Sequence, residues 1–493
     1  MLDFIDETLR DGPQSLWATR MRTETMLEAS TFLNKAGFSK ATVLSGASFE
    51  TAVKFLKDDP WERMRLVRSY LPDTPIDVLI RSRNLFGWSR YPDEVVELLL
   101  RCLQHNGTDT IKIFDGLNDI DTITAHIRIG KKLGLKVAGI LTFSISPIHT
   151  DARYAEKARQ YVALGIDSIL LCDASGILTA ARTETLLAAI KGVSGTTPIE
   201  FYAHASMGLA HDSYRAALRA GVDGVTTAAM PLANGESLPA TADIARIASE
   251  LGIPVGLDMD MVRKLDDYMY WAAYKENKPV GEPVIFDPVR YDRFVEHQIP
   301  GGMISNFRNQ LREVGLMHRV DEVLHEAGRV RADLGYPIMV TPFSQFVGVQ
   351  ATFNIIQGER YKTIPNEVRL FALGYYGDSG APVDANVLDK ILKGKSAERM
   401  APDTVFGERV LDQFRAQHGP FKSDEDLLLH LFYGRPAVEA LEQDKSVFTE
   451  GVSIRQPLRV LIHELSKQTT LKSISLEKGP RGGGAMRLNM SYA

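Results

Sequence analysis

Cysteine is scarce in this sequence, and so are long hydrophobic runs. Cys102 and Cys172 are the two cysteines among 493 residues and could form at most one bridge, which excludes a disulfide scaffold. The longest apolar stretches, such as residues 137–141 and 169–172, fall far short of the about 18 residues that a membrane span needs. Residues 1–12 carry acidic side chains where a signal peptide needs basic ones followed by an apolar run. We therefore expect a cytoplasmic protein in a reducing compartment.

An excess of charge of one sign is missing too. The 57 basic and 62 acidic residues are interspersed along the chain, which argues against a nucleic-acid-binding surface. The hydrophobic share of 44% and the charged share of 24% are ordinary for a globular protein. At roughly 100–200 residues per domain the length predicts two to four domains, although one α/β barrel can hold about 250 residues.

The first half of the chain repeats a single pattern, in which a short apolar or β-branched run is followed by a helical stretch. Residues 150–161, for example, show the apolar spacing near 3.6 that is typical of an amphipathic helix. Glycines that could end helices precede several runs, among them Gly37 and Gly134. The runs are residues 2–6, 41–45, 76–81, 110–115, 137–143, 168–173, 199–204 and 224–229. Eight such units within about 250 residues predict an α/β fold, a closed (β/α)8 TIM barrel, with a doubly wound open sheet as the alternative.

The rhythm changes near residue 260. Residues 258–277 and 306–334 read as helices, and the joints between them are rich in Pro and Gly. A further helical segment is predicted at residues 424–431. We therefore expect three parts: the barrel at residues 1–260, a mainly helical region at 261–400, and a helical extension with a flexible tail at 401–493.

Polar side chains stand at the predicted strand ends, where the active sites of barrel enzymes form. Tyr202 and His204 are two apart on the seventh strand, so they share a face and can both enter the barrel mouth. The other polar residues near strand ends are Asp6, Asp11, Gln14, Arg81, Asp115, Cys172 and Asp173. One such residue alone usually serves structure, whereas several on one face indicate a site. This set suits a small anionic substrate, because a guanidinium can bind a carboxylate by two hydrogen bonds while an acid and an imidazole hold a cation.

Residues 6–20, DETLRDGPQSLWATR, resemble the opening motif of the biotin-dependent carboxyltransferases. That family comprises pyruvate carboxylase, the alpha subunit of oxaloacetate decarboxylase and the transcarboxylase subunit that acts on pyruvate. Ser146-Pro-Ile-His-Thr150 is similar to a segment of the transcarboxylase subunit. The resemblance covers roughly residues 1–400 and continues in order through residues 59–63, 79–84, 112–119, 300–306, 340–345 and 374–377.

The resemblance implies a reaction and a set of roles. In the family, carboxybiotin on a carrier domain delivers its carboxyl group to the enolate of pyruvate, or the reverse reaction decarboxylates oxaloacetate. Carried over position by position, the pattern makes Asp6 and His204 metal ligands and Arg81 the clamp on the 2-oxo acid. Gln14 then donates a hydrogen bond to the substrate, and Asp11 supports the cluster. A divalent cation there would act as a Lewis acid that stabilises the enolate.

The sequence departs from the family at the positions closest to the chemistry. Tyr202 stands where the seventh strand of the family has the first histidine of a His-x-His pair, and Cys172 stands where the sixth strand has a carbamylated lysine. Glu236 aligns with the acceptor threonine that shuttles a proton between biotin and pyruvate. Pro13 replaces a histidine and Ala205 a small polar group.

A first reading of the altered site keeps the metal. Asp6, Cys172 and His204 then bind Zn²⁺ or Mn²⁺, with Tyr202 as a further candidate. A thiolate, imidazole and carboxylate set is acceptable for zinc.

Two other readings do without it. In one, the metal is lost, Tyr202 hydrogen-bonds the substrate, and Arg81 and Lys112 supply positive charge. In the other, Glu236 acts as a general base on a different acid. Across the three readings the expected catalytic residues are Asp11, Gln14, Arg81, Lys112, Cys172 and Glu236, and the expected substrate-binding residues are Gln14, Arg81 and Tyr202.

A Met-Lys-Met biotinylation site does not occur in this sequence, and neither does an ATP-binding biotin carboxylase segment. We therefore expect the biotin carrier and the biotin carboxylase to be separate chains, and family analogy predicts a homodimer or a higher oligomer. The chain is then the carboxyltransferase subunit of a multisubunit biotin-dependent carboxylase acting on a small 2-oxo acid or a related enolisable acid. The alternatives are a biotin-independent lyase, aldolase or decarboxylase on the same barrel, and a non-catalytic protein that binds a partner.

Overall fold

The computed structural model describes residues 2–299, 311–312, 315, 317–392 and 409–444, and the backbone of two strands at 473–478 and 486–491. The chain divides into two compact units, Met1–Lys445 and Ser446–Ala493. The family-like motif at residues 300–306 and the first part of the helix predicted over 306–334 lie outside the described residues.

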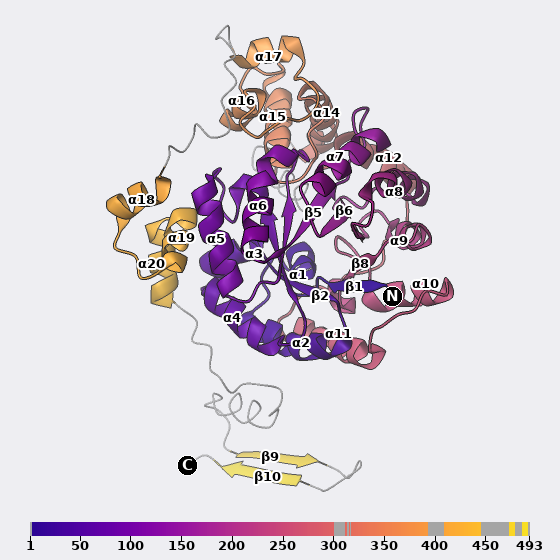
Figure 1. Cartoon of the computed structure of the whole chain (residues 1–493), viewed down its shortest axis with the longest axis vertical. Coiled ribbons are helices and arrows are strands. Elements are labelled where there is room, and N and C mark those ends of the chain that lie inside the picture. The colour runs from indigo at the N-terminus through magenta and orange to yellow at the C-terminus, as the bar shows by residue number, and fades with distance from the viewer. Residues whose placement is uncertain are drawn as a thin grey trace. The chain divides into compact units, whose positions relative to one another are not determined.

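Eight parallel strands close into a barrel in chain order, and β8 pairs with β1 (Figure 1). The strands are β1 (Asp3–Asp6), β2 (Lys40–Ser45), β3 (Ile76–Arg81), β4 (Thr110–Phe114), β5 (Lys136–Thr142), β6 (Ser168–Asp173), β7 (Ile199–Ala203) and β8 (Gly224–Thr227). All residues of β7 and β8 are buried, as expected for parallel strands with both faces covered. The predicted TIM barrel is confirmed, with a strand at each of the eight predicted runs.

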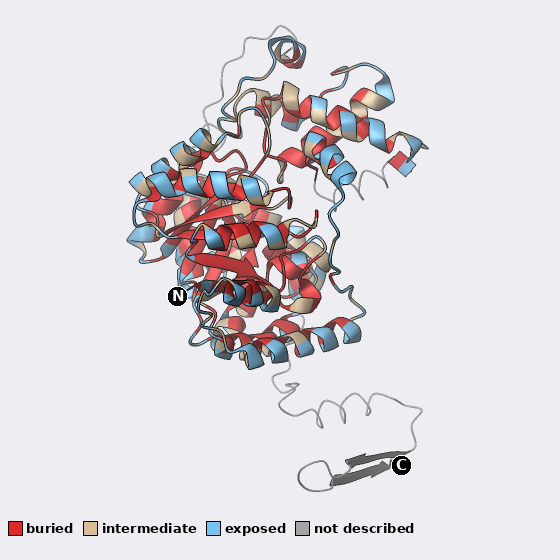
Figure 2. Cartoon of the chain, turned by 90° about the vertical axis from the view of Figure 1, so that its right-hand side faces the viewer, coloured by how far each residue is buried: buried red, intermediate tan, exposed pale blue. Residues whose placement is uncertain are grey.

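Helices form a ring around these strands because each turns an apolar face inward. In α5, Val95, Leu99 and Cys102 are buried at helical spacing, so Cys102 belongs to the core. Helix α2 ends at Gly37, whose φ of +86° lies in the left-handed region that favours glycine. Figure 2 shows the same division, with buried residues on the strands and exposed residues on the outward faces of the helices. The helices of this part are α1 (Asp11–Leu16), α2 (Thr23–Ala36), α3 (Gly46–Thr51), η1 (Ala52–Leu56), α4 (Pro60–Tyr70), η2 (Ser82–Asn84), α5 (Asp93–His105), η3 (Ile120–Ile123), α6 (Thr124–Lys132), α7 (Asp151–Ala163), α8 (Ala180–Ser194), α9 (Ala210–Arg219), η4 (Met230–Leu232) and α10 (Thr241–Glu250).

The helix predicted over residues 258–277 is confirmed as α11 (Met259–Lys275), and it packs against α2. Residues beyond 260 therefore still pack on the barrel, although the sequence predicted that the barrel ends at residue 260. Its buried residues Val262, Leu265 and Met269 recur at helical spacing.

The following region is mainly helical, as predicted, and has an apolar core of its own. Its helices are α12 (Pro288–His297), η5 (Met317–Arg319), α14 (Val320–Asp333), α15 (Phe343–Gln357), α16 (Asn366–Ala372) and α17 (Ala385–Leu392). Val323, Val330, Phe346, Val347 and Val368 are central members of this core.

Helices α18 (Val410–His418) and α19 (Asp424–Tyr433) lie beside α5, and α20 (Arg435–Asp444) contacts η1 and α19 (Figure 1). Trp61 Nε1 donates a hydrogen bond to the carbonyl of Glu425 at 3.3 Å. The Tyr433 hydroxyl donates to the carbonyl of Phe86 at 2.9 Å. The helix predicted over 424–431 is confirmed, and it is anchored to the barrel.

The second unit holds an antiparallel pair of strands, β9 (Ser473–Lys478) and β10 (Met486–Ser491), in which Ser475 faces Asn489. A helical extension and a flexible tail were predicted for residues 401–493. The two strands were not predicted, and the glycine-rich stretch at 479–485 lies outside the described residues. Ile474 and Leu476 alternate with polar residues, and glycines follow at 482–484, which together is the pattern of a hairpin.

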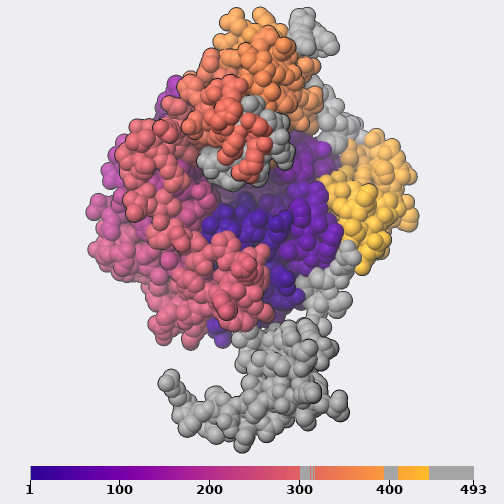
Figure 3. All heavy atoms as spheres, turned by 180° about the vertical axis from the view of Figure 1, so that it is seen from behind, coloured from indigo at the N-terminus to yellow at the C-terminus, as the bar shows by residue number. Residues whose placement is uncertain are grey.

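No helix in the described parts of the chain is long and apolar enough to cross a membrane. Figure 3 shows the face opposite to that of Figure 1. This face is hollowed where the N-terminal segment, in indigo, lies between the barrel helices and the helical region in coral and orange.

Candidate active site

Asp11, Tyr202 and His204 form a closed hydrogen-bonded triangle at the carboxyl ends of the strands. Tyr202 lies on β7, His204 directly follows that strand, and Asp11 begins α1 after β1. The Tyr202 hydroxyl donates to Asp11 Oδ1 at 2.6 Å, and its oxygen lies 2.8 Å from His204 Nε2. His204 Nε2 lies 3.1 Å from Asp11 Oδ2. The barrel thus joins residues nearly 200 positions apart into one network.

The contacts of Asp11 define where the protons lie. Three further donors reach it: Arg10 Nη1 at 3.1 Å, Ser15 Oγ at 3.3 Å and Ser237 Oγ at 3.4 Å. Asp11 is therefore an accepting carboxylate. The single hydroxyl proton of Tyr202 points to Asp11, so the contact between Tyr202 and His204 requires an N–H on Nε2. His204 shares this N–H between the phenol oxygen and the carboxylate.

The charges around the triangle agree with this assignment. Burial alone would raise the pKa of Asp11, but the charges of His204 and Arg10 outweigh it and hold that pKa well below its usual range. Burial alone would lower the pKa of His204, but the charge and hydrogen bond of Asp11 raise it. Burial, reinforced by the charge of Asp11, raises the pKa of Tyr202, so the phenol keeps its proton.

A chain of buried ion pairs holds Arg10 in place. Arg10 Nε donates to Glu7 Oε2 at 2.7 Å. Glu7 Oε1 accepts from Lys112 Nζ at 3.1 Å. The remaining contacts of Lys112 Nζ are with Thr42 Oγ1 at 2.8 Å and Asp77 Oδ2 at 3.0 Å.

Lys112 was predicted to be catalytic, which stays a prediction, and its surroundings favour a positioning role. The side chain is 1% exposed, and its ammonium donates hydrogen bonds to Glu7 and Thr42 and forms an ion pair with Asp77. The ammonium is thus buried among protein groups, away from the exposed mouth of the site. We assign it to positioning Glu7 and, through Glu7, Arg10.

Asp6 was predicted to be a metal ligand beside His204, but the structure pairs His204 with Asp11 instead. Asp6 is fully buried and accepts hydrogen bonds from Thr8 N at 3.0 Å and Thr8 Oγ1 at 2.7 Å. Burial raises the pKa of Asp6 to about 7 in spite of these hydrogen bonds. Asp6 therefore fixes the turn that follows β1.

Gln14 and Glu236 are both exposed, but they lie in different surroundings. Gln14 is three residues after Asp11 on α1, and its Oε1 accepts from Ser45 Oγ at 3.1 Å, where β2 ends. Glu236 is in the loop after η4, and it is the next residue, Ser237, that reaches Asp11. The structure thus places Gln14 near the network, whereas the predicted role of Glu236 as a base stays a prediction.

Arg81 lines a cavity of about 360 Å³ between the loop after β3 and the helices α15 and α16. Its Nη2 donates to the carbonyl of Gly87 at 3.3 Å, and its guanidinium carbon lies 4.9 Å from the centre of the Trp88 ring. Burial lowers the pKa of Arg81. Gln345 and Glu367 also line the cavity. No ion pair joins Arg81 to a carboxylate within the described ranges, so most of its five N–H donors are open to a ligand.

Cys172 faces Tyr202 across the pairing of β6 with β7. It is partly buried and packs against an apolar cluster that contains Ile140, Leu170 and the Tyr202 ring. Burial, with the charge of Asp173, raises the pKa of the Cys172 thiol. The residue is a neutral packing neighbour of Tyr202, and its predicted catalytic role stays a prediction.

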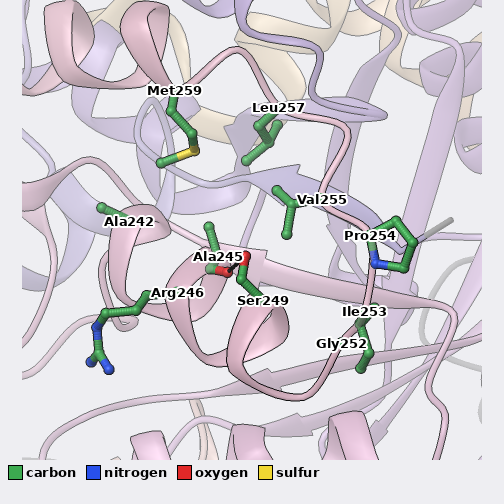
Figure 4. A pocket seen from close by; sticks show the side chains of 10 residues that line it. All are labelled: Ala242, Ala245, Arg246, Ser249, Gly252, Ile253, Pro254, Val255, Leu257 and Met259. Carbon is green, nitrogen blue, oxygen red and sulfur yellow. Dashed lines mark hydrogen bonds between the residues drawn. The ribbon is translucent and has the colours of Figure 1, made fainter.

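A second cavity, of about 580 Å³, lies between α10 and residues 252–259 (Figure 4). Most of the side chains drawn there are apolar. Arg246 is paired with Asp243 and Glu250 on its own helix. The cavity is on the side of Val255, which bridges to Leu2 before β1, so it lies away from the carboxyl ends of the strands. It offers no convergent chemistry, so the network around Asp11 and the cavity beside Arg81 are the candidates for the functional site.

A TIM barrel with an acid, imidazole and guanidinium set at its mouth and a helical region beyond it defines the class as a barrel enzyme acting on small anions. Comparison with known proteins makes this specific. Residues 294–481 match the family described as the conserved carboxylase domain. The chain belongs to the pyruvate carboxylase family of biotin-dependent carboxyltransferases, and it is a carboxyltransferase subunit of that type.

Three curated relatives carry this assignment. The chain is 36% identical over 451 residues to a subunit of the pyruvate carboxylase of Methanocaldococcus jannaschii, covering 90% of this chain and 78% of that protein. It is 34% identical over 442 residues to the methylmalonyl-CoA carboxyltransferase 5S subunit of Propionibacterium freudenreichii, covering 87% and 85%. It is 33% identical over 435 residues to the 2-oxoglutarate carboxylase large subunit of Hydrogenobacter thermophilus, covering 87% and 66%.

A solved structure agrees with them. The carboxyl transferase domain of Rhizobium etli pyruvate carboxylase, determined with oxamate and biotin, is 26% identical to this chain. The TM-score is 0.81, and the match covers 90% of this chain and 78% of that one.

Membership of this family implies a metal ion in the carboxyltransferase site. The described residues at this site do not fit one. In the described part of the chain, no group of three or more His, Cys, Asp or Glu side chains is placed to hold a metal ion. The phenol of Tyr202 bridges Asp11 and His204, and Cys172 packs in an apolar cluster. We therefore derive no catalytic step through a metal.

Two members of the network, Arg10 and Ser237, were missed at the sequence level. Arg10 is three residues after Glu7 in the opening motif, a spacing at which side chains on one turn meet, so a signal existed. Ser237 is adjacent to Glu236, so the sequence identified the correct loop but pointed to Glu236 instead of Ser237, the residue that contacts Asp11. A serine carries no charge that would have drawn attention to it.

Proposed function

We propose that this carboxyltransferase moves a carboxyl group between carboxybiotin, carried on a separate chain, and the enolate of a small 2-oxo acid that resembles pyruvate or oxaloacetate. Arg81 is the observation that carries the proposal. Its guanidinium lies in a cavity of about 360 Å³ without an ion-pair partner in the described ranges. A guanidinium binds a carboxylate through two parallel hydrogen bonds, so this cavity suits a small acid.

The roles of this chain's residues follow from their positions. Arg81 binds the carboxylate of the acid, and Gln14 provides an exposed amide at the mouth. Arg10 contributes a fixed positive charge, because Glu7 holds it against Asp11. Carboxybiotin, when bound, supplies the activated carboxyl group. Partly buried apolar side chains near Tyr202, such as Phe114, limit the access of water to the reacting groups.

The relatives' names support separate partners. Two of them are called subunits and a third a large subunit, which fits a biotin carrier and a biotin carboxylase on other chains. A homodimeric or larger assembly and a cytoplasmic location stay predictions.

Binding of oxamate, a stable analogue of a 2-oxo acid, tests the role of Arg81. We expect Arg81→Ala to weaken binding about 10- to 100-fold in isothermal titration calorimetry, because hydrogen bonds to a charged group contribute about 1.5–3 kcal/mol. Arg83→Ala is the matched control, since Arg83 lies in the same loop but pairs with Asp93 at 2.5 Å. Equal affinity of wild type and Arg81→Ala for oxamate would show that the acid binds elsewhere.

Turnover tests the use of biotin. We expect the purified chain to decarboxylate oxaloacetate faster when free biotin is added, because biotin accepts the carboxyl group. Decarboxylation at one rate with and without biotin would favour the alternative, a biotin-independent decarboxylase on the same barrel.

A further inference from the structure

The position of the Tyr202 hydroxyl is the starting point. Its oxygen lies 2.6 Å from Asp11 Oδ1 and 2.8 Å from His204 Nε2, so it occupies the point where these two side chains converge. Tyr202 itself is 4% exposed, and its ring packs against the apolar cluster that contains Leu170 and Ala228. The phenol is therefore held at this point by packing as well as by hydrogen bonds.

The length of the side chain explains why a phenol fits there. The hydroxyl of a tyrosine reaches farther from the backbone than the outer nitrogen of a histidine by about 2 Å, which is the length of a zinc–nitrogen bond. If position 202 were a histidine, its imidazole could hold an ion together with Asp11 and His204. The phenol oxygen of Tyr202 lies where that ion would lie.

The surrounding contacts leave no place for an ion in addition to the phenol. Asp11 Oδ1 accepts from Tyr202 and Arg10, and Asp11 Oδ2 is in contact with His204. His204 Nε2 carries a proton in this arrangement, so its lone pair is not available to a metal. The Arg10 guanidinium is buried, contacts Asp11 and lies 5.9 Å from the centre of the Tyr202 ring, so it already supplies the positive charge at this carboxylate.

We propose that the Asp11–Tyr202–His204 network takes the place of a metal ion in this carboxyltransferase, with Arg10 supplying the permanent positive charge. The composition of this centre does not depend on the substrate. Its catalytic part, that Arg10 and the imidazole of His204 stabilise negative charge on an enolate, with His204 acting through Nδ1, the ring nitrogen outside the triangle, rests on the proposed function. The His204 side chain, 13% exposed, is the member of the triangle that reaches the open mouth.

Metal titration tests the composition of the centre without any assay of activity. We expect protein purified without chelator to hold less than about a tenth of a metal ion per chain by elemental analysis. In calorimetric titration with Mn²⁺ or Zn²⁺, we expect neither the wild type nor Tyr202→Phe to bind metal at His204. Any heat of binding that they show should therefore remain when His204→Ala is added. Tyr202→His opens the space of the phenol oxygen and adds an imidazole, so we expect it to bind one ion per chain.

The controls separate the outcomes. Tyr202→His combined with His204→Ala should lose the engineered binding, and circular dichroism should show each variant folded. Wild-type binding of one ion per chain that disappears in His204→Ala would overturn the proposal. Folded Tyr202→His without metal binding would also overturn it, because the phenol would then not stand in an ion's place. Should that variant not fold, the wild-type titration still decides.

Activity then tests the catalytic part. We expect oxaloacetate decarboxylation by the wild type to be unchanged by a chelator, with kcat reduced at least about tenfold in Tyr202→Phe. If the protein holds no metal and turns over no 2-oxo acid, the metal-free centre stands and the proposed function is refuted. Turnover that a chelator abolishes and Mn²⁺ restores would refute the metal-free centre and leave the proposed function standing.

Discussion

Replacing Lys112 by Met is expected to destabilise the barrel itself. The Lys112 ammonium contacts Glu7 Oε1 at 3.1 Å, Thr42 Oγ1 at 2.8 Å and Asp77 Oδ2 at 3.0 Å, and the Lys112 side chain is 1% exposed. Methionine fills most of the lysine volume, so the cavity left behind is small. Two buried carboxylates each lose one cation, while Glu7 keeps Arg10 at 2.7 Å and Asp77 keeps Lys40 at 3.7 Å. Leaving a buried charge with no partner typically costs about 3–5 kcal/mol, so we expect a loss of about 2–3 kcal/mol here.

Urea unfolding followed by circular dichroism measures this change. Lys131→Met is the control, because Lys131 pairs with Asp167 at 2.7 Å but its side chain is 42% exposed, and such a pair contributes about 0.2–1 kcal/mol. Lys112→Met combined with Asp77→Leu should recover part of the loss, since one of the two buried carboxylates that lost a cation is then removed. A loss below about 1 kcal/mol in Lys112→Met, together with a collapse of kcat, would refute the positioning role and restore the catalytic one.

Three further predictions concern the network and the docking of α19. Burial raises the pKa of Asp6 to about 7 from 3.8, so the stabilising contribution of Asp6 is complete below pH 4 and is lost as the pH rises through 7. Asp6→Asn should therefore flatten the decline of the unfolding free energy between pH 4 and pH 7. An unchanged slope in this variant would contradict the prediction. Asp11→Asn removes the charge that offsets the burial of His204, so NMR titration should show a lower pKa for His204 than in the wild type, and an equal value would contradict their pairing. Tyr433→Phe removes the hydrogen bond to the Phe86 carbonyl and should cost about 0.5–1.5 kcal/mol in urea unfolding, whereas Tyr274→Phe, at a residue 87% exposed, should change nothing measurable.

The barrel could be predicted because its signals are local. Each strand is a short run bounded by helical stretches, and in β7 the run Ile-Glu-Phe-Tyr-Ala, residues 199–203, is buried throughout. The hairpin of β9 and β10 was missed although Ile474 and Leu476 alternate with polar residues. A six-residue alternation carries little weight beside the glycines that follow it, which indicate flexibility equally well.

The site was harder to predict because it depends on how deep each side chain lies in the barrel and on the direction in which it points. Asp6 and Asp11 are five residues apart at the end of β1, and both are acids near the barrel mouth. Asp6 ends the strand and is bound by Thr8, whereas Asp11 begins α1 and turns back toward β7. Lys112 points into the barrel like a catalytic residue, but it lies at a level where carboxylates surround it. Both distinctions arise only when the barrel closes.

Cys172 and Tyr202, the two positions at the centre where we expect the chain to depart from its family, are paired residues on adjacent strands, so we expect each to depend on the other. Neighbouring strands lie about 4.8 Å apart, so the side chain at 172 determines what position 202 can hold. A small neutral thiol leaves room for the phenol ring and for Arg10, which lies over that ring. A lysine at 172 would bring a second cation toward Arg10 and crowd the ring.

This coupling can be measured with a double-mutant cycle. We expect Cys172→Lys to destabilise the protein, and we expect its cost to be smaller in the Tyr202→His background, where the shorter ring leaves space for the longer side chain. Contacting residues typically show coupling free energies of about 0.5–3 kcal/mol, which urea unfolding can resolve. Cys172→Ala is the control, because alanine keeps position 172 small and neutral and should show little coupling to Tyr202→His. Additive costs for Cys172→Lys and Tyr202→His would mean that the two positions changed independently and that the phenol does not depend on the thiol beside it.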